Sequence, residues 1–268
     1  MRKVAGLILT ILLTAAMSFA QNGTPSSKAT AAYNTAVGCT VAFQTTIGTL
    51  PQSCHDIFSG AAVDVTPDNF ATVMSSTIKV SNSQSLFVSP SLVTGLYTQT
   101  TVKSKPGGGA SQAVAEGGVY MRAIITNQAT GDVQVAYPVA ACKPGILGCY
   151  SPTGSGPNYG VILDQRIQSL TQDISQCVVN VVVGGTPNTG SCNFDLTTDL
   201  ILNTTSAHSY NFIFPNVGTG VYTVDVQLGV DANANVSGSG TAIGAAAYGL
   251  GSLTVESVRL VRFCRTRT

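Results

Sequence analysis

The sequence predicts an all-β protein: a two-layer antiparallel β-sandwich of jelly-roll or immunoglobulin-like kind, with a loosely structured N-terminal segment. Apolar and polar residues alternate in many short runs, which is the period-two pattern of half-buried strands. Residues typical of turns separate these runs. Charged residues make up only 9% of the chain, but hydrophobic residues make up 44%, which is enough to bury a core. Many short strands with turns between them indicate a sandwich.

The stretch from Ser209 to Val230 has the clearest alternation. Apolar residues occupy every second position in both of its halves, and residues 215–220 between them contain the turn formers Pro, Asn and Gly. Two such runs around a turn predict an antiparallel hairpin. A lone hairpin is marginal in water, so other strands are needed to cover its apolar face, which consists of Tyr210, Phe212, Phe214, Tyr222, Val224, Val226, Leu228 and Val230.

The first twenty residues have the pattern of a secretory signal peptide. Arg2 and Lys3 precede an apolar run over residues 4–16, and Ser18-Phe19-Ala20 has the small-x-small form of a cleavage site. A membrane anchor is the alternative, but the run is shorter than the roughly 20 apolar residues that span a bilayer. We therefore expect a secreted, periplasmic or cell-surface protein, with no transmembrane segment after signal removal.

We expect four segments along the chain. They are a signal peptide over residues 1–20, a lead-in segment over 21–70, a single β-sandwich domain over 71–264 and a basic C-terminal tail over 265–268. The start of the lead-in is rich in Ser, Thr and Ala, which indicates little regular structure. One sandwich domain is favoured over two because the strands on both sides of the Pro- and Gly-rich loop at 142–160 need partners.

Three segments within this domain need separate interpretation. Residues 161–176 fit a strand pattern and also a helical stripe, and we favour strands because the neighbouring segments are β. Residues 231–244 are polar and Gly-rich, which indicates a connection. Near the C terminus the apolar positions change parity around Glu256–Ser257, which predicts a β-bulge there.

The seven cysteines are interpreted as an oxidised set. Six of them form neighbouring couples, and Cys264 is left as a free thiol or an intermolecular bridge. Six cysteines allow 15 connectivities, so the local pairing is a hypothesis. Metal ligation is the rival interpretation, but no C-x2-C motif occurs and the chain has only two histidines. The expected disulfides are Cys39–Cys54, Cys142–Cys149 and Cys177–Cys192.

No catalytic group, cofactor or metal site is predicted. Cys54-His55-Asp56 contains the residue types of a catalytic triad, but adjacent residues rarely point at one another. The segment that starts at Asp231 resembles the first half of a calcium loop, but it lacks the turn glycine and the final glutamate. A glycosidase needs two carboxylates across a cleft, and Glu116 and Glu256 are the only glutamates.

The leading expectation is an exported non-enzymatic protein that acts as a surface, matrix or assembly component. Its partner is expected to be a second copy or an extracellular polymer. The net charge of +1 does not supply the positive field that nucleic-acid binding needs. The alternative is a carbohydrate-binding module or a polysaccharide-active enzyme, for which Tyr150 and Tyr159 in the Pro- and Gly-rich loop are the candidate ligand contacts.

Overall fold

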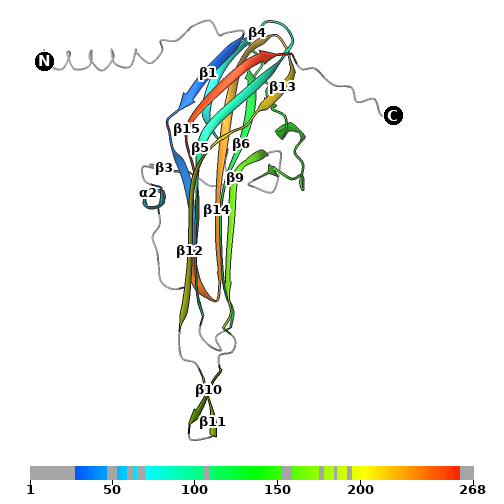
Figure 1. The fold of residues 1–268 in the computed structure, drawn as a ribbon. Coiled ribbons are helices and arrows are strands. Elements are labelled where there is room, and N and C mark those ends of the chain that lie inside the picture. The colour runs from blue at the N-terminus through cyan, green and yellow to red at the C-terminus, as the bar shows by residue number, and fades with distance from the viewer. Residues whose placement is uncertain are drawn as a thin grey trace, which may run out of the picture.

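The computed structural model describes residues 28–46, 53–58, 63–65, 70–104, 109–151, 159–174, 178–183, 186–191 and 195–259. In this part of the chain, two antiparallel sheets pack face to face and form an elongated sandwich (Figure 1). The predicted all-β sandwich is therefore confirmed.

The described part of sheet A has seven strands in the order β12-β5-β15-β2-β3, with β1 also on β15 and β13 also on β5. All of its pairs are antiparallel except the short parallel pair β2–β3. The strands are β1 (Ala29–Asn34), β2 (Gly38–Thr45), β3 (Val63–Asp64), β5 (Gln84–Ser104), β12 (Leu196–Ser209), β13 (Phe212–Val217) and β15 (Ser239–Val258).

The described part of sheet B has six strands in the order β4-β14-β6-β9-β8, with β7 also on β6. A separate two-stranded sheet, β10–β11, extends from one end of the sandwich (Figure 1). The strands are β4 (Ala71–Val80), β6 (Ser111–Asn127), β7 (Val133–Val135), β8 (Cys149–Tyr150), β9 (Gly160–Gln172), β14 (Gly220–Ser237), β10 (Val178–Val183) and β11 (Thr186–Ser191). The short helices are α2 (Cys54–Ile57) and the 3₁₀ turn η2 (Val139–Ala141).

The core lies between the two sheets, and the alternation in the sequence accounts for it. Strand β5 buries every even-numbered position from Leu86 to Ser104 and turns the odd-numbered ones outward. Strand β14 likewise buries Val224 and Val226 against the same core. Burial of an aliphatic or aromatic side chain of this size contributes about 1.5–3 kcal/mol each.

The predicted hairpin over Ser209–Val230 is wrong, although both of its strands exist. Phe212 and Phe214 lie in β13 and pair with β5 in sheet A, whereas Tyr222 and the residues after it lie in β14 and pair with β4 and β6 in sheet B. The turn therefore carries the chain from one sheet to the other. Both apolar faces point inward as expected, because the strands face each other across the core instead of sharing one sheet.

Residues 231–244 and the end of β15 also differ from expectation. Most of the predicted connection is strand, and the turn is confined to Gly238 (φ 82°), where β14 ends and β15 begins in the other sheet. The bulge predicted at Glu256–Ser257 is wrong, because the pairing with β5 is continuous there. The register shift lies instead between Gly249 and Gly251, which leaves Leu250 at a positive φ of 35°.

The ambiguous stretch agrees with expectation, whereas the lead-in segment is more regular than predicted. Residues 160–172 form the single strand β9, as favoured for the ambiguous stretch. From the predicted lead-in segment, β1 and β2 pair with β15 inside sheet A. The sandwich thus includes residues before position 71, and β15 gives these strands the partner that they lack locally.

Candidate functional site

Two of the predicted cysteine couples are disulfide-bonded. The Cα atoms lie 6.0 Å apart in Cys39–Cys54 and 5.6 Å apart in Cys142–Cys149, within the usual range for a disulfide. The first bond ties α2 to β2, and the second closes the loop before β8. Cys177, Cys192 and Cys264 lie outside the described residues.

The Cys54-His55-Asp56 segment serves local structure. Ser53 is the N-cap of α2, and its hydroxyl accepts a hydrogen bond from the Asp56 N–H while the Asp56 side chain accepts from the Ser53 N–H. This is a capping box, which satisfies two backbone donors at the start of a helix. The hydrogen bond from the Ser53 side chain is the main cause that lowers the pKa of Asp56.

Tyr150 and Tyr159, the predicted ligand contacts, make intramolecular contacts. The Tyr150 ring stacks on Tyr120 with centroids 3.5 Å apart, and its hydroxyl donates to Asp231 Oδ2 at 2.5 Å. Burial and the bond to Asp231 raise the pKa of Tyr150. Tyr159 is partly buried against the main core. Binding of an external ligand by either tyrosine stays a prediction.

The two glutamates and Asp231 do not converge on one site. Glu116 lies on the outer face of sheet B and accepts from Gln165 Nε2 at 2.8 Å. Glu256 is exposed on the outer face of sheet A. The two glutamates therefore cannot flank one glycosidic bond. Asp231 lies within β14, and the described residues contain no group of three or more His, Cys, Asp or Glu placed to hold a metal ion.

A Ser–His–Asp cluster that the sequence analysis missed lies between β12 and β9. Ser206 Oγ is 2.7 Å from His208 Nε2, and Asp164 Oδ2 is 3.4 Å from the same nitrogen. Asp164 also accepts from Thr94 Oγ1 at 2.7 Å. In a catalytic triad the serine and the carboxylate use different ring nitrogens. Because both groups contact Nε2 here, the imidazole cannot take the serine proton while the carboxylate holds its other nitrogen.

The same interface continues as a hydrogen-bonded seam of buried polar side chains. Gln168 is 5% exposed; its Oε1 accepts from Thr98, and its Nε2 donates to Thr100 and to the carbonyl of Leu200, each at 2.7 Å. An unpaired buried amide costs about 1–3 kcal/mol, so these bonds explain how polar residues fill this half of the sandwich. The seam attaches β12 to β9 and is structural.

A groove, here called the sheet-A groove, hollows the outer face of sheet A. Its volume is about 430 Å³. Small residues on adjacent strands make its floor, because Gly95 pairs with Ala247. Phe58, held beside α2, leans over the floor: a Cβ atom on Gly95 would lie 3.0 Å from its ring. Small floor residues and an overhanging ring thus create the hollow.

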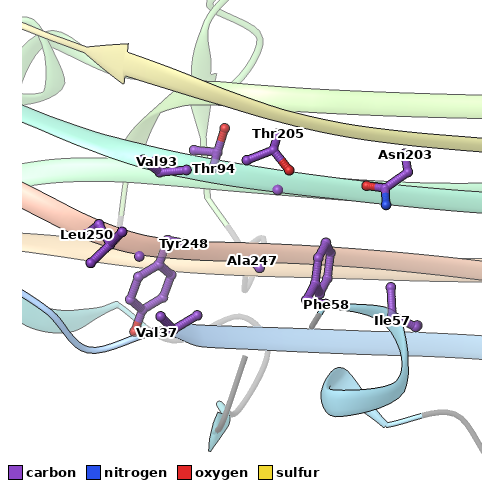
Figure 2. A pocket seen from close by; sticks show the side chains of 12 residues that line it. Val37, Ile57, Phe58, Val93, Thr94, Asn203, Thr205, Ala247, Tyr248 and Leu250 are labelled. Carbon is purple, nitrogen blue, oxygen red and sulfur yellow. The ribbon is translucent and has the colours of Figure 1, made fainter. Parts of the chain in front are cut away.

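The rim of the sheet-A groove combines apolar and neutral polar groups. Figure 2 shows Val93, Thr205 and Asn203 along one side and Val37, Tyr248 and Phe58 along the other. Leu250 projects at one end and is 62% exposed. All lining residues that the structure describes are uncharged. Such a lining offers contact and hydrogen bonding, but no group that titrates near neutral pH.

Strand β12 borders the groove and is the terminal strand of sheet A. It pairs with β5 along its whole length, and its other edge pairs with no strand of the described part. Large apolar side chains normally lie inside a fold, yet several are exposed along this strand. They are Leu196 (45%), Leu200 (40%), Ile201 (52%) and Leu202 (42%). Sequence alternation could not reveal this edge, because position in a sheet depends on distant strands.

Comparisons with known proteins identify no relative, so the groove and the edge strand carry the functional argument. No family model matches the chain, and no curated protein matches its sequence. Within the described residues, no helix is long and apolar enough to cross a membrane.

Proposed function

We propose that the protein is an exported, non-enzymatic component of a surface, matrix or assembly, and that it binds its partner through the sheet-A groove and strand β12. One observation carries the proposal: an uncharged groove of about 430 Å³ lies directly beside an edge strand with exposed apolar side chains. Binding pockets are typically concave and apolar, with a few polar groups that set orientation. Asn203 and Thr205 supply such groups here.

The edge strand supports the same surface. An unpaired strand edge presents backbone N–H and C=O groups to any extended chain, and proteins normally protect such edges with Lys, Pro or a covering segment. Strand β12 contains no Lys, Arg or Pro. Strand addition at a free edge is a common mode of recognition, with backbone bonds providing affinity and neighbouring pockets providing specificity. The groove beside β12 is suited to the second role.

Export is supported by the cysteine chemistry. Disulfides persist in oxidising compartments and are rare in the cytosol, and two are formed in the described part of the chain. The signal-peptide pattern of residues 1–20 supports the same placement. We therefore propose that the protein functions at the cell surface, in the periplasm or in the surrounding medium.

The groove is tested by filling it. Thr205→Trp puts a bulky ring on the rim, and Thr197→Trp puts the same ring on the same exposed face of β12 but outside the groove. Purified proteins are incubated with extracellular material from the native host, and the bound fraction is measured. We expect wild type and Thr197→Trp to bind and Thr205→Trp to lose most binding. Equal binding by all three, or by none, would contradict the proposal.

A neutral polysaccharide is the second candidate ligand. A further hollow of about 370 Å³ shares Val93 and Leu250 with the groove and is flanked by Tyr33, which is 81% exposed. An exposed aromatic ring beside amide and hydroxyl groups can stack on a sugar. Calorimetric titration with neutral oligosaccharides tests this: binding that Tyr33→Ala abolishes favours the sugar, and cleavage of the oligosaccharide would indicate an enzyme.

A further inference from the structure

Strand β12 carries a palindromic sequence centred on Ile201. Moving outward from Ile201 in either direction, the chain has Leu, then Asp or Asn, then two Thr. In full, the segment is Thr197-Thr198-Asp199-Leu200-Ile201-Leu202-Asn203-Thr204-Thr205. The whole palindrome lies within β12, on the terminal strand of sheet A.

We propose that two copies of the protein pair antiparallel along β12, with a two-fold axis at Ile201, so that their A sheets join into one continuous sheet. This inference rests on the proposed function for its surface: it assigns the edge of β12 to a second copy of the chain and leaves the sheet-A groove to the extracellular partner. In a two-fold interface, residue i contacts residue j and j contacts i. An antiparallel pair centred on Ile201 therefore places every residue of the palindrome opposite its own kind or its closest isostere.

The centre of this pair is apolar. Leu200 of one copy faces Leu202 of the other on the inner side, and the two Ile201 side chains meet on the outer side, because side chains alternate along a strand. All three are 40–52% exposed in the single chain. Pairing across the edge covers apolar surface on both faces of the strand at once, which a ligand in the groove alone would not do.

The charges also suit a second copy. Asp199 lies opposite Asn203 of the partner copy, so an amide meets a carboxylate and the two aspartates do not face each other. Asp199 already accepts a hydrogen bond from Thr101 Oγ1 at 2.8 Å. His208, the other ionisable residue of β12, contacts Ser206 and Asp164. Like charges directly opposite would destabilise a strand pair, and this register contains none within the palindrome.

The edge strand is held ready for pairing. Arg166 donates from its guanidinium group to Thr204 Oγ1, and Gln168 donates to the carbonyl of Leu200. Both donors come from β9 in the opposite sheet. They attach β12 to the body of the sandwich, so association loses little additional chain entropy.

A cross-linking experiment tests the register. In a Cys264→Ser background, Ile201→Cys places two thiols opposite each other at the axis, at a separation that strand pairing and disulfides share. Thr205→Cys is the control, because position 205 faces position 197. Under mild oxidation we expect a covalent dimer from Ile201→Cys, none from Thr205→Cys, and one from the double variant Thr197→Cys with Thr205→Cys. Absence of the Ile201→Cys dimer, or equal cross-linking of both single variants, overturns the proposal.

Two substitutions of opposite charge at position 203 supply a second test. Asn203→Asp places two aspartates opposite each other twice per dimer, whereas Asn203→Lys places a lysine opposite Asp199 in the same two pairs. By sedimentation equilibrium we expect about tenfold weaker dimerisation for Asn203→Asp and no weakening for Asn203→Lys. Equal effects of both substitutions overturn the register, and a wild type that stays monomeric at tens of micromolar overturns the pairing itself.

These outcomes are separable from failure of the proposed function. Positions 197 and 205 face each other in the pair, so Thr197→Trp and Thr205→Trp disturb dimerisation equally and differ only at the groove. A monomeric wild type that still binds host material in a Thr205-dependent manner overturns the pairing and leaves the proposed function intact. A wild type that dimerises but binds no host material overturns the proposed function and leaves the pairing intact.

Discussion

Tyr150 donates a hydrogen bond from its hydroxyl group to Oδ2 of Asp231, 2.5 Å away, and its ring lies parallel to that of Tyr120 at an interplanar angle of 6°. The contact joins β8, which contains Cys149 of the Cys142–Cys149 disulfide, to strand β14 of the same sheet. It therefore holds the short strand β8 against the sandwich in addition to its pairing with β9.

This contact predicts that the protein loses stability at alkaline pH. Burial and the bond to Asp231 raise the pKa of Tyr150 above its ordinary value of 10.0, so the stabilisation is fully present below pH 10 and is lost as the pH rises above it. Wild type should lose up to about 1.4 kcal/mol of unfolding free energy per pH unit more than Tyr150→Phe in that range. Denaturant titrations from pH 8 to 11.5 measure this; parallel curves would contradict the assignment.

Because β13 and β14 face each other across the core, the structure predicts which substitutions in them lower the free energy of unfolding. Phe212 and Val226 are 0% exposed on facing sheets, so Phe212→Ala or Val226→Ala should each cost about 2–5 kcal/mol. Thr223 points outward and accepts from Gln128 at 3.1 Å, so Thr223→Ala should cost under about 1 kcal/mol. Urea unfolding of the three variants compares them. Equal losses at Thr223 and Val226 would mean that the facing of β14 is wrong.

The strands could be predicted from the sequence, but their partners could not. Alternation along β13 and β14 is a local pattern, and it correctly identified the buried side of each. Phe212, however, pairs with Val88, more than a hundred residues away, and a turn such as 215–220 is compatible with a hairpin or with a crossing between sheets. The bulge is misplaced for a related reason: the register shift lies between Gly249 and Gly251, where Leu250 itself takes the positive φ, and parity alone does not show this.

The candidate site depends even more on non-local geometry. Gly95 and Ala247 form a groove floor only because β5 and β15 are neighbours. His208 meets Asp164 only across the two sheets. One signal was available in the sequence, namely the palindrome around Ile201, but its meaning depends on β12 being the terminal strand. Edge status is a property of the completed sheet.

The Ser206–His208–Asp164 cluster is predicted to be chemically inert. Both oxygens contact the same imidazole nitrogen, so Ser206 has no base that is oriented for proton transfer. A fluorophosphonate probe should leave Ser206 unlabelled, and Ser206→Ala should bind host material like wild type. Mass spectrometry of the probe-treated protein provides the measurement. Labelling at Ser206 that His208→Ala abolishes would establish a nucleophile and refute the structural role.

The Cys39–Cys54 disulfide is predicted to support the groove as well as the fold. It closes 15 residues, so replacing both cysteines with alanine should cost about 3 kcal/mol of unfolding free energy. Because Cys54 anchors the segment that carries Phe58, the same variant should bind host material more weakly. The Cys142–Cys149 disulfide closes only 7 residues. Replacing both of these cysteines with alanine should therefore cost about 2 kcal/mol of unfolding free energy and leave the binding of host material unchanged. Equal binding of host material by both double variants would mean that Phe58 does not contribute to the binding site.

The central claim is that this protein acts by contact through the outer face of sheet A and the edge of β12. Hydrogen–deuterium exchange tests it most directly, measured on the free protein at a concentration low enough to keep it monomeric and on the protein bound to native extracellular material. We predict that binding slows amide exchange in residues 196–209, and in 93–95 and 247–250 of the adjoining groove strands, with no change in β4 or β9. Protection confined to the outer face of sheet B, with β12 exchanging as fast as in the free protein, would contradict the account.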